Sequence, residues 1–214
     1  MPKDRSAKGE HRLIRTADIS GKERYQLLTS LVVPRPIGWL STFAKDGTPN
    51  LAPFSYFAPL ADTPMLVGAS IGWRAGEPKD TLRNILDTRA FCINVVTEPQ
   101  LEAMNATSGD YPPEVDEFKA AGLPMAEGSV VRAPFVENCP AVMECRLYKE
   151  VELGTAANSL VLGEVLAVRV APEIRFVPGA YHVETESLRP VGRLFAGGYT
   201  LLGKIKTIPR PRVG

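Results

Sequence analysis

Residues 34–57, PRPIGWLSTFAKDGTPNLAPFSYF, contain the pattern that decides the fold. Over residues 37–43 the side chains are apolar or small on both alternating faces, which favours a strand covered on each side. Asp46 and Gly47 follow shortly after, and this dipeptide is the strongest short hairpin signal in the chain. The sequence therefore predicts an antiparallel return strand over residues 51–57.

Further segments along the chain predict a mainly β domain. Strands are expected at 65–71, 91–97, 140–153 and 159–170, and short helices at 21–31, from near Asp80, at 101–106 and at 115–121. Six strands with few helices and several turn signals favour a closed barrel over an open sheet. The strand at 140–153 alternates between apolar and charged residues, so one of its sides is expected to face water.

Outside the barrel, two terminal segments stand apart. Residues 1–17 are highly charged without an apolar period, which predicts a flexible N-terminal arm. The predicted domain spans 18–200, and residues 201–214 form a basic tail that is expected to be solvated. Residues 98–138 are richer in Pro, Gly and Glu and are expected to form an excursion on the barrel surface.

Composition excludes several classes of protein. Lys and Arg number 25 against 24 Asp and Glu, so no basic field is available for nucleic acid. No apolar run approaches the roughly 20 residues that cross a bilayer, and the charged first residues resemble no secretion signal, which favours a cytoplasmic protein. The three cysteines form no CxxC pair and the two histidines lie far apart in the sequence, so neither a disulfide framework nor a metal site is predicted. Buried, unreactive thiols are expected instead.

No catalytic residue is indicated either. The chain has no GxGxxG, GxxxxGK[ST] or GxSxG motif, and its Asp and Glu residues are assigned to turns, caps and charged faces. Two local features remain unusual. Pro53 interrupts an apparent strand, because proline cannot donate to a ladder. An irregular strand there would free backbone groups for a flat heterocycle such as a flavin ring, whereas a simple edge strand or bulge explains the proline equally well.

The second feature is EPKDTLRN at 77–84, which places Lys79 and Thr81 at the start of a helix. Unsatisfied N–H groups and the positive end of the helix dipole favour a phosphate at such a position. Asp80 is the natural N-cap, and its carboxylate would repel a phosphate unless it turns back into the helix. A capped surface helix with a solvated lysine is the commoner reading of an isolated KDT.

Together these segments resemble the flavin reductase-like, FMN-binding split-barrel family, which includes flavoredoxin. The resemblance covers roughly residues 25–200. It is carried by PRPIGWLST (34–42), DGTPNLAPFSYF (46–57), KDTLRNI (79–85), INVV (93–96), PAVMEC (140–145), LVLGEV (160–165) and RPVGRL (189–194). The resemblance implies a six-stranded antiparallel Greek-key split barrel with a few short peripheral helices. It also implies a homodimer, with non-covalent FMN held near the subunit interface by both chains.

The resemblance further implies which residues contact the cofactor. Around the flavin it places Trp39, Ser41 and Thr42, and at the ring and ribityl edge Asn50, Leu51, Ala52, Pro53 and Ser55. Lys79 and Thr81 would take the phosphate with help from Ser70 or Arg74. Arg193 and Tyr199 would approach from the partner chain. Similar chains follow GRL with GGNxY, whereas this chain reads GRLFAGGY, so Phe195 and Ala196 put the placement of Tyr199 in question.

The leading functional hypothesis is an NAD(P)H-dependent flavin oxidoreductase that passes hydride to the flavin and on to an acceptor, which is a small molecule or a protein. The cofactor carries the difficult chemistry in such an enzyme, so a dedicated general base is not required. Two alternatives remain open: a flavoredoxin-like electron carrier reduced by a protein partner, and a non-enzymatic FMN-binding protein. A homodimer is also expected, from the doubly apolar strand at 37–43 together with the family likeness.

Overall fold

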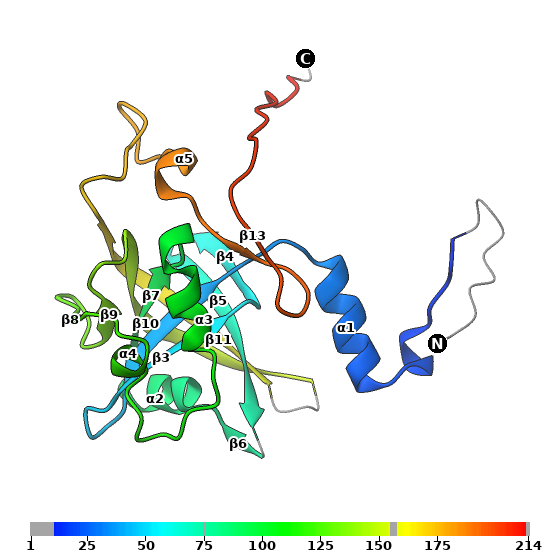
Figure 1. Ribbon diagram of the computed structural model, residues 1–214, viewed down its shortest axis with the longest axis horizontal. Coiled ribbons are helices and arrows are strands. Elements are labelled where there is room, and N and C mark those ends of the chain that lie inside the picture. Colours follow the sequence, from blue (N-terminus) through cyan, green and yellow to red (C-terminus); the bar gives the residue numbers. More distant parts are fainter. Residues whose placement is uncertain (1–10, 75, 155–157, 213–214) are drawn as a thin grey trace.

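The computed structural model describes residues 11–74, 76–154 and 158–212. Most of the expected N-terminal arm, residues 1–10, therefore lies outside the described residues. The rest forms an antiparallel β barrel flanked by short helices (Figure 1). The main sheet runs in the order β3 (Pro49–Phe54), β2 (Gly38–Phe43), β7 (Ala90–Val95), β10 (Ala141–Leu153), β11 (Asn158–Val170), β5 (Met65–Arg74), β4 (Phe57–Asp62), and β6 (Glu77–Pro78) pairs with β5.

This architecture confirms the predicted fold class, although the path through the sheet contains seven strands instead of six. The hairpin predicted at Asp46 and Gly47 is present between β2 and β3. Gly47 has a φ of +93°, a backbone conformation that favours glycine, and the Asp46 carboxylate accepts the N–H of Thr48 at 2.9 Å. The register of β2 and β3 continues without a shift from Phe43 to Gly38.

The prediction of one return strand over residues 51–57 was wrong. β3 ends at Phe54, and Phe57 begins β4, which pairs with β5 at the opposite end of the sheet. Ser55 and Tyr56 carry the chain from β3 to β4. We call this break between the two strands the seam. Pro53 itself lies in a regular edge strand paired with β2, so the interruption that the proline signalled occurs two residues later.

The four helices predicted from the sequence are present, with small differences at their ends. The helix α1 (Gly21–Leu31) begins with the predicted capping box, in which the Ser20 hydroxyl accepts the Glu23 N–H and the Glu23 carboxylate accepts the Ser20 N–H. The helix α3 (Leu101–Ala106) matches its predicted bounds, and α4 (Glu117–Ala120) is shorter than predicted. In α2 (Asp80–Thr88) the N-cap is Lys79, not Asp80 as predicted. Asp80 is the first helical residue and pairs with Arg83.

The remaining elements are short. They are the 3-10 turns η1 (Thr16–Asp18) and η2 (Glu98–Gln100), the helix α5 (Thr185–Leu188), the strand pair β8 (Met125–Glu127) and β9 (Pro134–Val136), and a three-stranded sheet of β1 (Arg35–Pro36), β12 (Gly192–Arg193) and β13 (Tyr199–Thr200). The three-stranded sheet joins the segment before β2 to the hairpin of β12 and β13. No helix among the described residues is both long and apolar enough to span a bilayer.

Two apolar clusters cover both faces of β2. One contains Trp39 and Leu51 and lies under the excursion, and the other contains Leu40 and Phe54 and lies under α2. The doubly apolar pattern at 37–43 is thus satisfied within a single chain. The three cysteines are buried free thiols, as predicted, and burial raises the pKa of Cys92 to about 12 and that of Cys139 to about 11.

The alternation predicted that the charged side of β10 faces water, but part of this side is buried. Glu144 is fully buried, its carboxylate accepting the N–H groups of Val130 and Val131 and a 2.7 Å bond from Arg169 Nε. Burial alone would raise the pKa of Glu144, but these donors together hold it below its usual value. A buried carboxylate needs such partners, and the two N–H groups come from the loop 13 and 14 residues before it.

Candidate functional site

Two cavities meet at the end of β3, and Pro53 and Ser108 line both of them. We call them the Lys79 cavity and the Arg193 cavity. The Lys79 cavity is lined by Asn50, Ala52, Pro53, Phe54, Arg74, Lys79, Asp80, Thr81, Glu117 and the segment 107–111. The Arg193 cavity is lined by Tyr25, Arg35, Ile37, Pro53, Ser55, Met104, Ser108, Arg193, Leu194, Ala196 and Tyr199. The interrupted strand and the helix start predicted from the sequence therefore border one continuous region.

The cations of the Lys79 cavity differ in their availability. Arg74 pairs with Asp110 at 2.7 Å. The Lys79 ammonium lies 5.9 Å from the centroid of the Phe54 ring, and no carboxylate among the described residues pairs with it. Asp80 turns toward Arg83 along its own helix, so its charge is partly compensated. Lys79 and the first N–H groups of α2 are thus the groups of this cavity that are free to bind an anion.

Buried polar side chains form a chain of hydrogen bonds behind that helix start. The Thr81 hydroxyl donates to Asn50 Oδ1 at 2.7 Å, and Asn50 Nδ2 donates to Glu117 at 2.8 Å. The other Glu117 oxygen accepts the N–H of Leu51 at 3.0 Å, and Asn84 donates to Thr42 Oγ1 at 3.1 Å. These bonds fix the orientation of the Asn50 amide, and with it the direction of the Thr81 hydroxyl.

Glu117 and Arg35 are charged lining residues that sequence reasoning missed. The sequence predicted a helix at 115–121, but nothing in the local pattern says that Glu117 reaches β3. Burial raises the pKa of Glu117, and the N–H donors of Leu51 and Asn50 oppose this shift in part. A carboxyl group thus stands at the inner wall of the Lys79 cavity, and sequence reasoning had assigned all carboxylates to turns, caps and charged faces.

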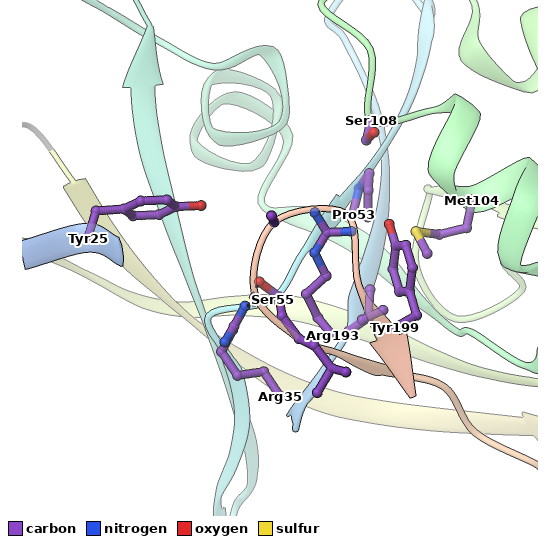
Figure 2. Close-up of a pocket in the computed structure, with 11 residues that line it drawn as sticks. Tyr25, Arg35, Pro53, Ser55, Met104, Ser108, Arg193 and Tyr199 are labelled. Carbon is purple, nitrogen blue, oxygen red and sulfur yellow. Dashed lines mark hydrogen bonds between the residues drawn. The ribbon is translucent and has the colours of Figure 1, made fainter. Parts of the chain in front are cut away.

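In the Arg193 cavity, the hairpin between β12 and β13 places Arg193 directly opposite Tyr199. The Arg193 guanidinium lies beside the Tyr199 ring (Figure 2), 4.5 Å from the ring centroid. The Tyr199 hydroxyl donates to Asn105 at 2.8 Å. The extra residues Phe195 and Ala196 form the turn, in which Ala196 has a φ of +52°. The GRLFAGGY departure thus still brings Tyr199 to the cavity. Arg193 and Tyr199 both line the cavity of their own chain.

Several residues that the resemblance places at the cofactor do not line either cavity. Trp39 is fully buried and donates from Nε1 to Thr107 at 2.9 Å. Ser41 is also buried and donates to the carbonyl of Pro134 at 2.6 Å. The cavities are lined by Asn50, Ala52, Pro53, Ser55, Arg74, Lys79, Thr81, Arg193 and Tyr199, whereas Trp39, Ser41, Thr42, Leu51 and Ser70 do not line either of them.

The comparison with protein families identifies the family of the chain. A model described as the flavin reductase like domain matches residues 30–185. The chain belongs to the flavin reductase-like family. Oxidoreductase chemistry on a flavin is the activity that membership suggests.

Individual relatives match over nearly the whole chain. A protein of Aquifex aeolicus (strain VF5) is 40% identical over 178 residues, which cover 83% of this chain and 89% of that protein. The crystal structure of nitrilotriacetate monooxygenase component B from Bacillus cereus is 32% identical with a TM-score of 0.89, covering 93% of this chain and 99% of that one. The Pseudomonas fluorescens 2-nitrobenzoate 2-nitroreductase NbaA is 26% identical with a TM-score of 0.85, covering 94% and 96%.

Proposed function

We propose that the protein binds FMN without a covalent link and works as an NAD(P)H-dependent flavin oxidoreductase. The observation that carries this proposal is the convergence of Pro53 and Lys79 on one cavity. A phosphate at the start of α2 would be held by Lys79 and by the first N–H groups of the helix. Pro53 and Ala52 would lie along the ring and ribityl edge. The similarity to a structure named as a nitroreductase supports a redox role.

The residues present fit this cofactor at the phosphate end. Lys79 is a cation without a carboxylate partner among the described residues, and Asp80 turns toward Arg83. The Glu117 carboxylate opposes an anion, but burial raises its pKa and the hydrogen bonds with Leu51 and Asn50 occupy its oxygens. Bound FMN would supply the hydride-accepting centre. The chain's residues bind and orient it, and we assign no catalytic acid or base.

A homodimer completes the proposal. The Lys79 and Arg193 cavities have volumes of about 80 and 150 Å³. Both are smaller than the roughly 300 Å³ at which pockets for cofactor-sized ligands begin, so a second surface is needed to cover the ligand. The helix α1 stands beside the barrel (Figure 1). Its side chains Leu28 and Leu31 are exposed, as is Val32 directly after it. Such a helix favours association with a second copy.

The test begins with the visible spectrum of the purified protein before and after desalting. A flavin spectrum that survives desalting supports a resident cofactor. Anaerobic mixing with NADH and with NADPH follows, and rapid bleaching by one of them supports the oxidoreductase. A bound flavin that neither nucleotide bleaches would refute NAD(P)H dependence and point to an electron carrier reduced by a protein. Light scattering at micromolar concentration measures the mass, and a monomer would refute the dimer.

A further inference from the structure

The Arg193 cavity differs from the Lys79 cavity in its charge. Arg35 and Arg193 are its charged lining residues, and its lining contains no Asp or Glu. The Lys79 cavity, in contrast, is lined by three carboxylates and two cations. Of the two neighbouring cavities, the one beyond Pro53 is therefore the more positive. An anion is favoured there even before any particular ligand is considered.

Arg35 gives this cavity a charge that cannot move away. Its side chain is buried, and Nη1 donates to the carbonyls of Thr29 and Val32 at 2.7 Å, while Nη2 donates to the carbonyl of Leu194 at 3.0 Å. Neutral carbonyls satisfy its hydrogen bonds but do not cancel its charge. Because the same guanidinium joins the end of α1 to the β12–β13 hairpin, it also fixes the two walls between which the cavity opens.

Arg193 supplies the group that a ligand would contact. Its side chain is partly exposed, and Figure 2 shows the guanidinium beside the Tyr199 ring near Pro53. The Tyr199 ring is itself held by the bond to Asn105. No hydrogen bond or ion pair occupies the Arg193 guanidinium within the part of the chain that the structure describes. Its planar fork of donors matches a carboxylate, which accepts two parallel hydrogen bonds.

We infer that the Arg193 cavity binds the carboxylate of a small organic second substrate, next to the flavin site. This inference rests on the proposed function, which places the flavin in the Lys79 cavity. Pro53 lines both cavities, so a ligand in the Arg193 cavity would lie next to the flavin. The volume of about 150 Å³ has room for a small carboxylate within one chain, without the second surface that a larger ligand needs. The assigned occupant is therefore the acceptor, which this cavity can hold by itself, and not the nicotinamide nucleotide.

The experiment compares benzoate with its neutral analogue benzamide. Each is titrated calorimetrically into the FMN-loaded protein and into the protein without flavin. We expect benzoate to bind at least tenfold more tightly than benzamide. We expect Arg193→Gln to weaken benzoate binding roughly ten- to a hundredfold, because a charge-assisted pair is lost. Arg193→Lys keeps the charge but not the fork of donors, so its affinity for benzoate should lie between those of the unchanged protein and of Arg193→Gln. Arg132→Gln is the matched control, since Arg132 is exposed and lines neither cavity.

Four outcomes would overturn the inference. Benzoate fails to bind at millimolar concentration, benzoate and benzamide bind equally, or Arg193→Gln leaves benzoate binding unchanged. In the fourth, Arg193→Gln weakens FMN or NAD(P)H binding tenfold while benzoate binding is retained, so the cavity serves a nucleotide phosphate. Because the titrations also use the flavin-free protein, a chain that binds benzoate but never FMN separates failure of the proposed function from failure of this inference.

Discussion

Replacing Lys79 by alanine is expected to weaken FMN binding roughly ten- to a hundredfold. A hydrogen bond between a cation and a phosphate contributes about 1.5–3 kcal/mol, and each 1.4 kcal/mol changes a dissociation constant about tenfold. No neighbouring cation replaces it, because Arg74 already pairs with Asp110 and Arg83 with Asp80. Lys79 is exposed, so its removal should leave the stability of the fold nearly unchanged.

The assay is quenching of flavin fluorescence, with FMN and riboflavin titrated in parallel into flavin-free protein. Riboflavin lacks the phosphate, so its affinity should not respond to Lys79→Ala. Lys45→Ala is the matched control, because Lys45 pairs with Asp87 near the other end of α2. An equal loss for both flavins, or no loss for FMN, would refute the assignment of the phosphate to the start of α2.

Three further predictions concern stability, each measured by urea unfolding. Glu144→Gln should cost about 1–3 kcal/mol at neutral pH, because one buried acceptor is lost; since the pKa of Glu144 is lowered, this difference should vanish as the pH falls through that pKa. The raised pKa of Glu117 has the opposite sign, so ionisation of Glu117 destabilises the fold as the pH rises through that pKa, and Glu117→Gln should flatten this part of the curve. Gly163→Ala should cost about 1–3 kcal/mol, because its Cβ would lie 2.4 Å from the buried Phe91 ring; Gly203→Ala, with open space around it, should cost little by comparison.

The elements set by local chemistry were predictable from the sequence. The Ser20 capping box fixed the start of α1, and Asp46 with Gly47 fixed the β2–β3 hairpin. The seam was not predictable, because Ser55 and Tyr56 carry no turn signal of the kind found at Gly47. Whether Phe57 continues β3 or joins β5 depends on pairing with a strand that the local pattern does not reveal.

The candidate site was predictable in its two ends but not in its lining. Pro53 and Lys79 do border one cavity, and each carries a local signal. The signal of Pro53 is its missing N–H donor, and that of Lys79 is its place at a helix start. Trp39 and Glu117 illustrate the opposite case. Trp39 lies on a strand with two covered faces, and only the fold shows that its indole donates to Thr107. Glu117 reaches β3 from 66 positions further along the chain, a distance at which no periodicity gives guidance.

The prolines of the two outermost strands have a consequence for how copies of this chain meet. β3 contains Pro49 and Pro53, and β4 contains Pro59, so both margins of the sheet lack donors at those places. The Leu51 amide, which lies between the two prolines of β3, is capped by Glu117. A foreign strand therefore finds few groups with which to extend the sheet, and the margins resist amyloid-like growth. Any assembly must be built from side chains on helices and faces, which permits a closed, finite oligomer.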